Sequence, residues 1–262
     1  MESIITKLSS LLDAMPPITL EEMSSIRLMN RTDTKFVTNL STLYRLLDMA
    51  RDDYYAQEVC GKRISPYRTT YWDGEERHEM YRTHVTGHAT RMKVRVRTYV
   101  DSGVTFLEVK KKDNHGQTRK IRTSVPSLDA VIKERAGEAF LEDHTGYSFG
   151  EITPTLGNEF NRITLVNRGK TERLTIDFAL NFYNYETGRE AGMQDAVIIE
   201  LKRDGRVSSP ILAILRALRV KPAGFSKYCV GVSITNEDLR QNRFKPRLHK
   251  IDKIIHKQQA MP

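Results

Sequence analysis

Charged side chains at every second position of a predicted strand constrain this sequence more than any other feature. In residues 91–100, Lys93, Arg95 and Arg97 alternate with Val94 and Val96. Successive side chains of a strand point to opposite faces of the sheet, so the three cations share one face and the valines share the other. A basic strand face must meet either water or an anion, while its apolar face packs against other elements.

The same alternation recurs in five further segments. The charged sets are Arg31, Asp33 and Lys35; Glu108, Lys110 and Lys112; Lys120 and Arg122; Arg173 and Asp177; and Glu200 and Lys202. Like charges that face each other across strands repel. A water-facing sheet therefore explains any one of these strands, but it explains all six poorly. The alternative interpretation is a barrel whose charged faces point inward around a highly anionic ligand, with its apolar faces packed outward against helices.

The net charge of +9 is concentrated in two places. Residues 91–122 hold ten Lys or Arg and three acids, and residues 239–262 hold seven Lys or Arg and one acid. Such segments suit nucleic acid, anionic lipid or another polyanion. No apolar run approaches the roughly 18 residues that span a bilayer, and the N-terminus lacks the pattern of a secretory signal. We therefore expect no transmembrane segment and a cytoplasmic location.

Apolar periodicity predicts about eight mostly antiparallel strands with a few helices between them, an α+β fold. The helices are expected over 3–15, 41–51, 127–142 and 208–218, and the strands over 26–38, 54–59, 64–72, 91–100, 104–112, 118–124, 158–167, 173–178, 182–185 and 196–202. Residues 75–88 are polar and give no clear pattern, and residues 224–230 suggest a short segment that begins with glycine.

The order of the charged motifs resembles a known family. Lys93-x-Arg95-x-Arg97 is followed by Glu108-x-Lys110; Arg31–Lys35 and Tyr71-Trp72-Asp73 precede them; and Asn161-Arg162, Arg173–Asp177, Ile199–Lys202 and Phe225–Tyr228 follow. Together they resemble the VTC domain, the catalytic domain of vacuolar transporter chaperone polyphosphate polymerases, in the triphosphate tunnel metalloenzyme (CYTH-like) superfamily. The resemblance runs from about residue 27 to residue 228.

This resemblance implies an antiparallel tunnel barrel of eight strands with a charged interior and helices packed outside. We expect one tunnel domain over 1–238, with its core at about 27–230, and a basic tail over 239–262. The implied activity is transfer of the γ-phosphoryl group of ATP to a growing inorganic polyphosphate chain, assisted by Mn²⁺ or Mg²⁺. Coupling to transport would need a membrane-protein partner, which would place the chain peripherally at a membrane.

Site residues follow from the resemblance, motif by motif. The phosphate path would be lined by Lys35, Arg95, Arg97, Lys110, Lys120, Arg162, Arg173 and Lys227. Further contacts to the nucleotide are expected from Lys93, Lys202, Ser226 and Phe160, with Phe160 as a candidate for adenine stacking. Glu200 would be the principal metal ligand and Glu108 a second one, although both could simply pair with nearby lysines. Ser226 and Lys227 could form an anion-binding turn or cap a helix.

One departure from the wider superfamily concerns the first strand. Tunnel hydrolases begin with Glu-x-Glu-x-Lys, whereas this chain has Arg31-Thr32-Asp33-Thr34-Lys35. The substitution weakens the case for a two-metal hydrolase and favours the polymerase branch. Two alternatives stay open: a tunnel triphosphatase acting on tripolyphosphate or nucleoside triphosphates, and a non-catalytic binder of polyphosphate or RNA. Few aromatic residues alternate with the basic ones, so we expect no specific nucleic acid partner.

Overall fold

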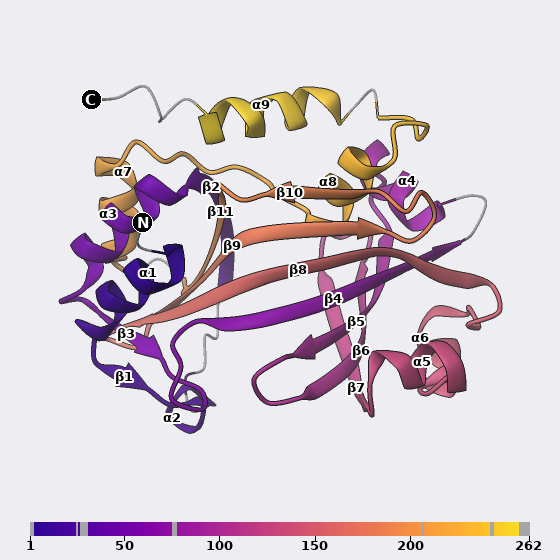
Figure 1. Cartoon of the computed structure of the whole chain (residues 1–262), viewed down its shortest axis with the longest axis horizontal. Helices are drawn as coiled ribbons and strands as arrows, with labels where there is room; N and C mark the ends of the chain where they lie inside the picture. Colours follow the sequence, from indigo (N-terminus) through magenta and orange to yellow (C-terminus); the bar gives the residue numbers. More distant parts are fainter. Residues whose placement is uncertain are drawn as a thin grey trace.

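A computed structural model describes residues 3–24, 26, 31–74, 78–205, 207–241 and 244–256. A single antiparallel path dominates it, in the order β2-β11-β9-β8-β4-β5-β6-β7 (Figure 1). These strands are β2 (Arg31–Asn39), β4 (Ser65–Gly74), β5 (Arg91–Tyr99), β6 (Val104–Lys112), β7 (Thr118–Val125), β8 (Ile152–Asn167), β9 (Glu172–Asn184) and β11 (Ala196–Asp204). The path thus has the eight antiparallel strands that the sequence predicted.

Two details differ from the predicted barrel. Within the described ranges the sheet has eleven strands, because β1 (Pro17–Ile18), β3 (Tyr54–Gln57) and β10 (Glu190–Met193) pair at its margins. In addition, the end strands β2 and β7 do not pair with each other there, so the sheet is curved but not closed by hydrogen bonds. The fold is nevertheless the expected α+β arrangement, with helices on the outside of an antiparallel sheet.

Most helices cover the outer face of the sheet (Figure 1). The bounds are α1 (Ile4–Asp13), α2 (Leu20–Ser24), α3 (Leu40–Ala50), α4 (Glu79–Thr86), α5 (Leu128–Glu134), α6 (Glu138–Thr145), α7 (Pro210–Ala217), α8 (Lys227–Thr235) and α9 (Lys245–His256). Helices α1, α3 and α7 pack on apolar residues of β8, β9 and β11, while α5 and α6 contact β5, β6 and β7. No described helix is long and apolar enough to cross a membrane.

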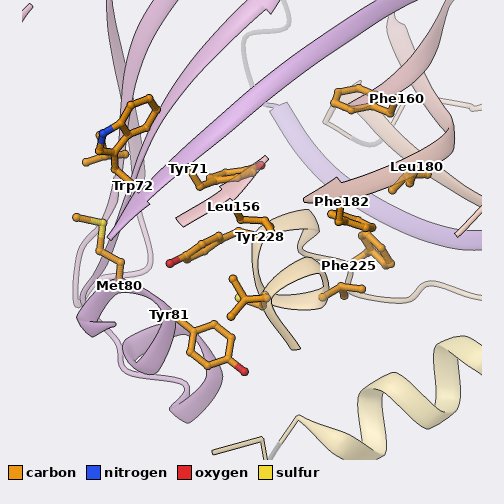
Figure 2. Close-up of a cluster of buried hydrophobic side chains, with 14 of the residues drawn as sticks. Tyr71, Trp72, Met80, Tyr81, Leu156, Phe160, Leu180, Phe182, Phe225 and Tyr228 are labelled. Atoms are coloured by element: carbon orange, nitrogen blue, oxygen red, sulfur yellow. The ribbon is translucent and has the colours of Figure 1, made fainter. Parts of the chain in front are cut away.

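Helix α8 was not predicted, and it has an unusual position. It packs on β8, β9, β10 and α4, and seven of its nine residues are buried. A Cβ atom on Gly231 would lie 2.5 Å from Leu156 Cδ2 and from Phe182 Cδ1, so the helix touches the sheet closely. Figure 2 shows Tyr228 of this helix beside Tyr71, and the two rings stack at 5.0 Å. A helix buried on every side has no apolar stripe, which explains why periodicity missed it.

Other predicted elements need correction. The helix expected over 127–142 is two helices, because Arg135 and Gly137 have positive φ angles and a Cβ on Gly137 would lie 2.9 Å from Leu107 Cδ2. The segments 173–178 and 182–185 form one strand, β9. Within the polar stretch 75–88, residues 79–86 form α4, whose first turn is held by Asp73.

The basic tail is also partly ordered. Residues 245–256 form α9, which packs on β2, and Ile251 and Ile255 join the main apolar core. Asn39 Nδ2 donates a hydrogen bond to the carbonyl of Ile255 at 3.3 Å. The described part of the tail is therefore docked on the sheet through its apolar side, and its lysines and arginines are exposed.

Candidate functional site

The predicted phosphate-path residues lie on one face of the curved sheet. On β5 the opposite face is apolar, since Val94 and Val96 are buried in the core, which confirms the predicted alternation. The strand register then aligns the charged face: Lys93 pairs with Lys110 and Lys110 with Lys120, while Arg95 pairs with Glu108. On the other side of the path, Glu200 pairs with Lys35, and Lys202 with Arg173.

Curvature brings the two ends of this face together. Strands β11 and β6 are five steps apart in the sheet order, which would be about 24 Å in a flat sheet. Yet Lys110 of β6 lies in the electrostatic field of both Lys35 and Glu200. The turn before α8 bridges the remaining distance: Lys35 Nζ donates to the Phe225 carbonyl at 3.4 Å, and Lys93 Nζ donates to Ser226 Oγ at 2.9 Å. The charged face is thus the interior of a tunnel.

Glu108 is the centre of the first ion-pair cluster. Its carboxylate, 1 % exposed, accepts a hydrogen bond from Arg95 Nε at 2.6 Å and pairs with Lys120. Burial alone would raise the pKa of Glu108, but Arg95, Arg97 and Lys120 outweigh burial and lower the pKa to about 2. Glu108 is therefore a fixed anion that orients Arg95 and Lys120 toward the interior. These cations occupy the oxygens that a metal ion would need.

Asp177 is the centre of the second cluster. It ends the Arg173–Asp177 motif, but it was not among the predicted site residues. Arg162 donates to its two oxygens from Nε and Nη2 at 2.6 and 2.8 Å, and Lys227 donates to Oδ2. Burial would raise the pKa of Asp177, but Arg162 and Lys227 hold it well below its usual range. The signal was present in the sequence, because Asp177 shares the charged face with Arg173 and alternates with the apolar Leu174 and Ile176.

Glu200 differs from these two acids. Its oxygens lie 3.7 Å from Lys35 Nζ and 3.6 Å from Lys202 Nζ, and its side chain is 25 % exposed. Burial would raise its pKa, but Lys35 and Lys202 together lower it, so Glu200 is ionised at neutral pH. Its carboxylate is therefore charged, accessible from the interior and held at ion-pair distance rather than by short hydrogen bonds to the two lysines.

These properties bear on the implied divalent metal. No group of three or more potential protein ligands occurs in the part of the chain that the structure describes. Mg²⁺ typically binds one or two carboxylates together with substrate phosphates and water, rather than a cage made only of protein ligands. The accessible carboxylate of Glu200 suits a cation that enters with a phosphate ligand. Glu108 suits it poorly, because Arg95 and Lys120 already bind its oxygens.

Four interior lysines have weakened proton affinity. Burial, aided by neighbouring cations, lowers the pKa of Lys93 and of Lys110 to about 8. Burial also lowers the pKa of Lys120 and of Lys227 to about 8, although Glu108 and Asp177 partly oppose this. Burial lowers the pKa of Arg97 to about 10, with Arg95 and Arg162 adding to the effect. The interior is thus crowded with cations that an anionic ligand would stabilise.

Ser226 caps α8, as one of the two alternatives predicted: its Oγ accepts from Cys229 N at 3.2 Å. The same oxygen accepts from Lys93, so the helix cap and the basic face share an atom. The positive end of the helix dipole therefore lies inside the basic tunnel, where it favours an anion.

Aromatic rings line the tunnel wall beside Arg162. Phe160 is buried and stacks on Tyr67, with centroids 5.3 Å apart, and Lys227 Nζ lies 4.1 Å from the centroid of Phe160. Arg97 and Arg162 also lie over these rings. Phe160 thus supports three cations in this structure, while its predicted contact with adenine stays a prediction. Arg173 lies on the same face and donates to the Met23 carbonyl at 3.4 Å.

Comparison with solved structures identifies the fold. A candidate adenylyl cyclase from Hippeastrum, described as having a dominant triphosphatase activity, is 15 % identical, with a TM-score of 0.51 over 79 % of this chain and 97 % of its own. A candidate adenylate cyclase from Bacillus halodurans is 12 % identical, with a TM-score of 0.50 over 76 % of this chain and 96 % of its own. No curated protein matches the sequence.

The curved antiparallel sheet and its basic interior define the class: this is a protein of the tunnel fold, with an interior suited to an anionic ligand. Within this class the family is also clear, because the VTC domain family matches residues 30–236, most of the chain. The chain belongs to the VTC domain family, as the order of its motifs predicted.

Proposed function

We propose that this protein is a polyphosphate polymerase that transfers the γ-phosphoryl group of ATP to the terminal phosphate of a polyphosphate chain. The observation that carries the proposal is the tunnel interior. The charged face of the sheet holds Lys35, Lys93, Arg95, Arg97, Lys110, Lys120, Arg162, Arg173 and Lys202, and α8 adds Lys227, around Glu108, Asp177 and Glu200. Two of these acids, Glu108 and Asp177, are committed to ion pairs.

The reaction brings two anions together. A terminal phosphate oxygen of the chain attacks the γ-phosphorus of ATP in line; a new P–O bond forms, the bond to the β,γ-bridging oxygen breaks, and ADP leaves with that electron pair. Positioning and charge neutralisation dominate such transfers, and no base is needed because the attacking oxygen is already ionised. The fixed cations of the tunnel provide both.

Individual residues divide this work. Asp177 holds the guanidinium of Arg162 in a bidentate pair, and it anchors Lys227, so both cations are preorganised before the substrate arrives. Glu108 does the same for Arg95 and Lys120. Lys93 of β5 reaches Ser226 at the N-terminus of α8, where both would contact a nucleotide phosphate. The ring of Phe160 makes a cation–π contact with Lys227.

The divalent cation would be held by Glu200 together with substrate phosphates. It would neutralise phosphate charge and stabilise the leaving group, and Mn²⁺ or Mg²⁺ both suit oxygen ligands of this type. Lys35 and Lys202 flank Glu200 and would release it to the cation while they turn toward the phosphates.

The test is a polymerisation assay with purified protein, ATP and either Mn²⁺ or Mg²⁺. We expect long polyphosphate and ADP, and loss of both with Glu200→Gln or Lys227→Met. Folding of the variants is checked by their thermal melts. If the wild-type protein makes no polymer with either metal, the polymerase proposal fails.

A tunnel triphosphatase is the second candidate, since a structure with this fold is described as having a dominant triphosphatase activity. It differs only in the acceptor, which would be water. Measuring free orthophosphate against chain length separates the two: a triphosphatase releases orthophosphate from tripolyphosphate and builds no chain. The first-strand sequence Arg31-Thr32-Asp33 supports the polymerase over this alternative, because it lacks the paired glutamates of tunnel hydrolases.

A further inference from the structure

A basic groove lies on the outer face of the sheet, outside the tunnel. It has a volume of about 830 Å³ and lies over β5, β6 and β7 beside α6. Its cations are Arg91, Lys111, Lys112 and Arg119, and its floor includes Met92, Val109 and Ile121. Asp113, Asp143 and His144 also line it, together with the neutral residues Thr90 and Gln117. Neither the proposed reaction nor the tunnel needs this groove.

Like charges face each other in this groove, which costs electrostatic repulsion. Lys111 and Arg119 are directly opposite each other on β6 and β7, and both are exposed. On the adjacent rung, Lys110 and Lys120 face each other on the tunnel side. The hairpin of β6 and β7 therefore has opposed cations on both faces near its tip. Facing like charges destabilise a sheet, and an anion bound beside Lys111 and Arg119 would relieve this repulsion on the outer face.

The inner and outer cations are also continuous. Arg91 and Lys112 pair across β5 and β6, and by alternation they extend the tunnel-side rows of Lys93 and Lys110. Nevertheless both line the outer groove, because they lie where the strands end. The basic surface thus runs from the tunnel interior around the ends of these strands to the outer face.

One of the groove's two acids is held within a turn, and the other, Asp143, is exposed. Asp113 is held in the turn between β6 and β7, where its Oδ1 accepts from Gln117 N at 2.8 Å. His144 packs against Phe140, with ring centroids 4.6 Å apart. Arg91 donates to the His88 carbonyl at 2.7 Å, which fixes this cation at the strand end. Of the groove's four cations, Lys111 and Arg119 are exposed, whereas Arg91 and Lys112 are half-buried.

We propose that a polyphosphate chain too long for the tunnel continues around the ends of β5 and β6 and lies in this outer groove, against Lys111 and Arg119. The inference rests on the proposed function, since it assigns a place to the chain that the tunnel would extend. The chemistry is that of a flexible linear polyanion: it follows a curved row of cations without needing complementary bases or a flat surface.

The experiment compares a short and a long ligand on the full chain. The double variant Lys111→Gln, Arg119→Gln should bind tripolyphosphate as the wild type does, because both side chains point away from the tunnel. It should bind chains of several dozen phosphates about tenfold more weakly, and the slope of log affinity against log salt should fall by about 1.4. A matched control, Lys250→Gln with Lys253→Gln on the exposed side of α9, should change neither.

Different outcomes distinguish the failures. Unchanged long-chain affinity and salt slope in the double variant would overturn the groove while leaving the tunnel proposal intact. An equal loss with single-stranded RNA of similar charge would also overturn it, as evidence of a general polyanion surface. If the wild type binds neither tripolyphosphate nor long chains, the proposed function itself fails. A product distribution shifted to shorter chains in the double variant would support the groove further.

Discussion

Replacing Lys93 with methionine should make the ligand-free protein more stable and impair its binding of phosphate chains. In the folded protein burial and neighbouring cations lower the pKa of Lys93 from 10.5 to about 8. That difference corresponds to about 3 kcal/mol of folding free energy lost at pH 7. Methionine has a similar shape and no charge, but it loses the hydrogen bond to Ser226, which is worth about 1 kcal/mol. The expected net gain is about 2 kcal/mol.

The gain should depend on pH in a defined direction. Lys93 holds its proton less tightly in the folded than in the unfolded state, so its cost is constant below about pH 8. The cost shrinks as the pH rises from 8 toward 10.5, where the unfolded lysine also loses its proton. At pH 9.5 it should be about 1 kcal/mol, which the lost hydrogen bond cancels. The variant's advantage should therefore disappear at this pH.

Urea unfolding followed by tryptophan fluorescence measures this effect, because Trp72 is the single tryptophan and is buried. The matched control is Lys111→Met, on the opposite and exposed face of β6, which should gain at most about 0.5 kcal/mol from the relief of its repulsion with Arg119. Tripolyphosphate should raise the unfolding midpoint of the wild type and of the control more than that of Lys93→Met. A variant less stable than the wild type at pH 7, or a gain independent of pH, would refute this account of the tunnel cations.

Three further predictions concern the rest of the site and its support. Asp177→Asn should lower the free energy of unfolding by about 3 kcal/mol, because it leaves Arg162 and Lys227 buried without their anion; a loss under 1 kcal/mol in urea titrations would contradict this. Tripolyphosphate affinity should fall above pH 8, as Lys227 and its neighbours lose protons. Calorimetry in buffers of different ionisation enthalpy should then detect proton uptake on binding near pH 8. Binding without proton uptake would contradict this prediction. Gly231→Ala should destabilise the fold by about 1–3 kcal/mol, since its Cβ would meet Leu156 and Phe182, whereas Gly224→Ala, in open space, should melt within a degree or two of the wild type.

Strand periodicity predicted the structure more accurately than helix periodicity did. Alternation alone separated Lys93, Arg95 and Arg97 from Val94 and Val96, because a strand's two faces are set by chain geometry at each residue. Helix periodicity failed for α8, because this helix is buried on all sides and shows no apolar stripe. It also failed at 127–142, where the break depends on the left-handed backbone at Arg135 and on the contact of Gly137 with Leu107.

Alternation along the strands was thus enough to predict which side chains share a face, and the order of the motifs was enough to predict the VTC domain family. What each charge does depends on the folded structure. Glu108 and Glu200 look alike as strand carboxylates, yet Glu108 is enclosed by Arg95 and Lys120 while Glu200 remains accessible. That difference arises from strand register and sheet curvature, which join residues far apart in the chain. The lowered pKa values of the lysines have the same origin, because burial and crowding exist only once the sheet has curved around them.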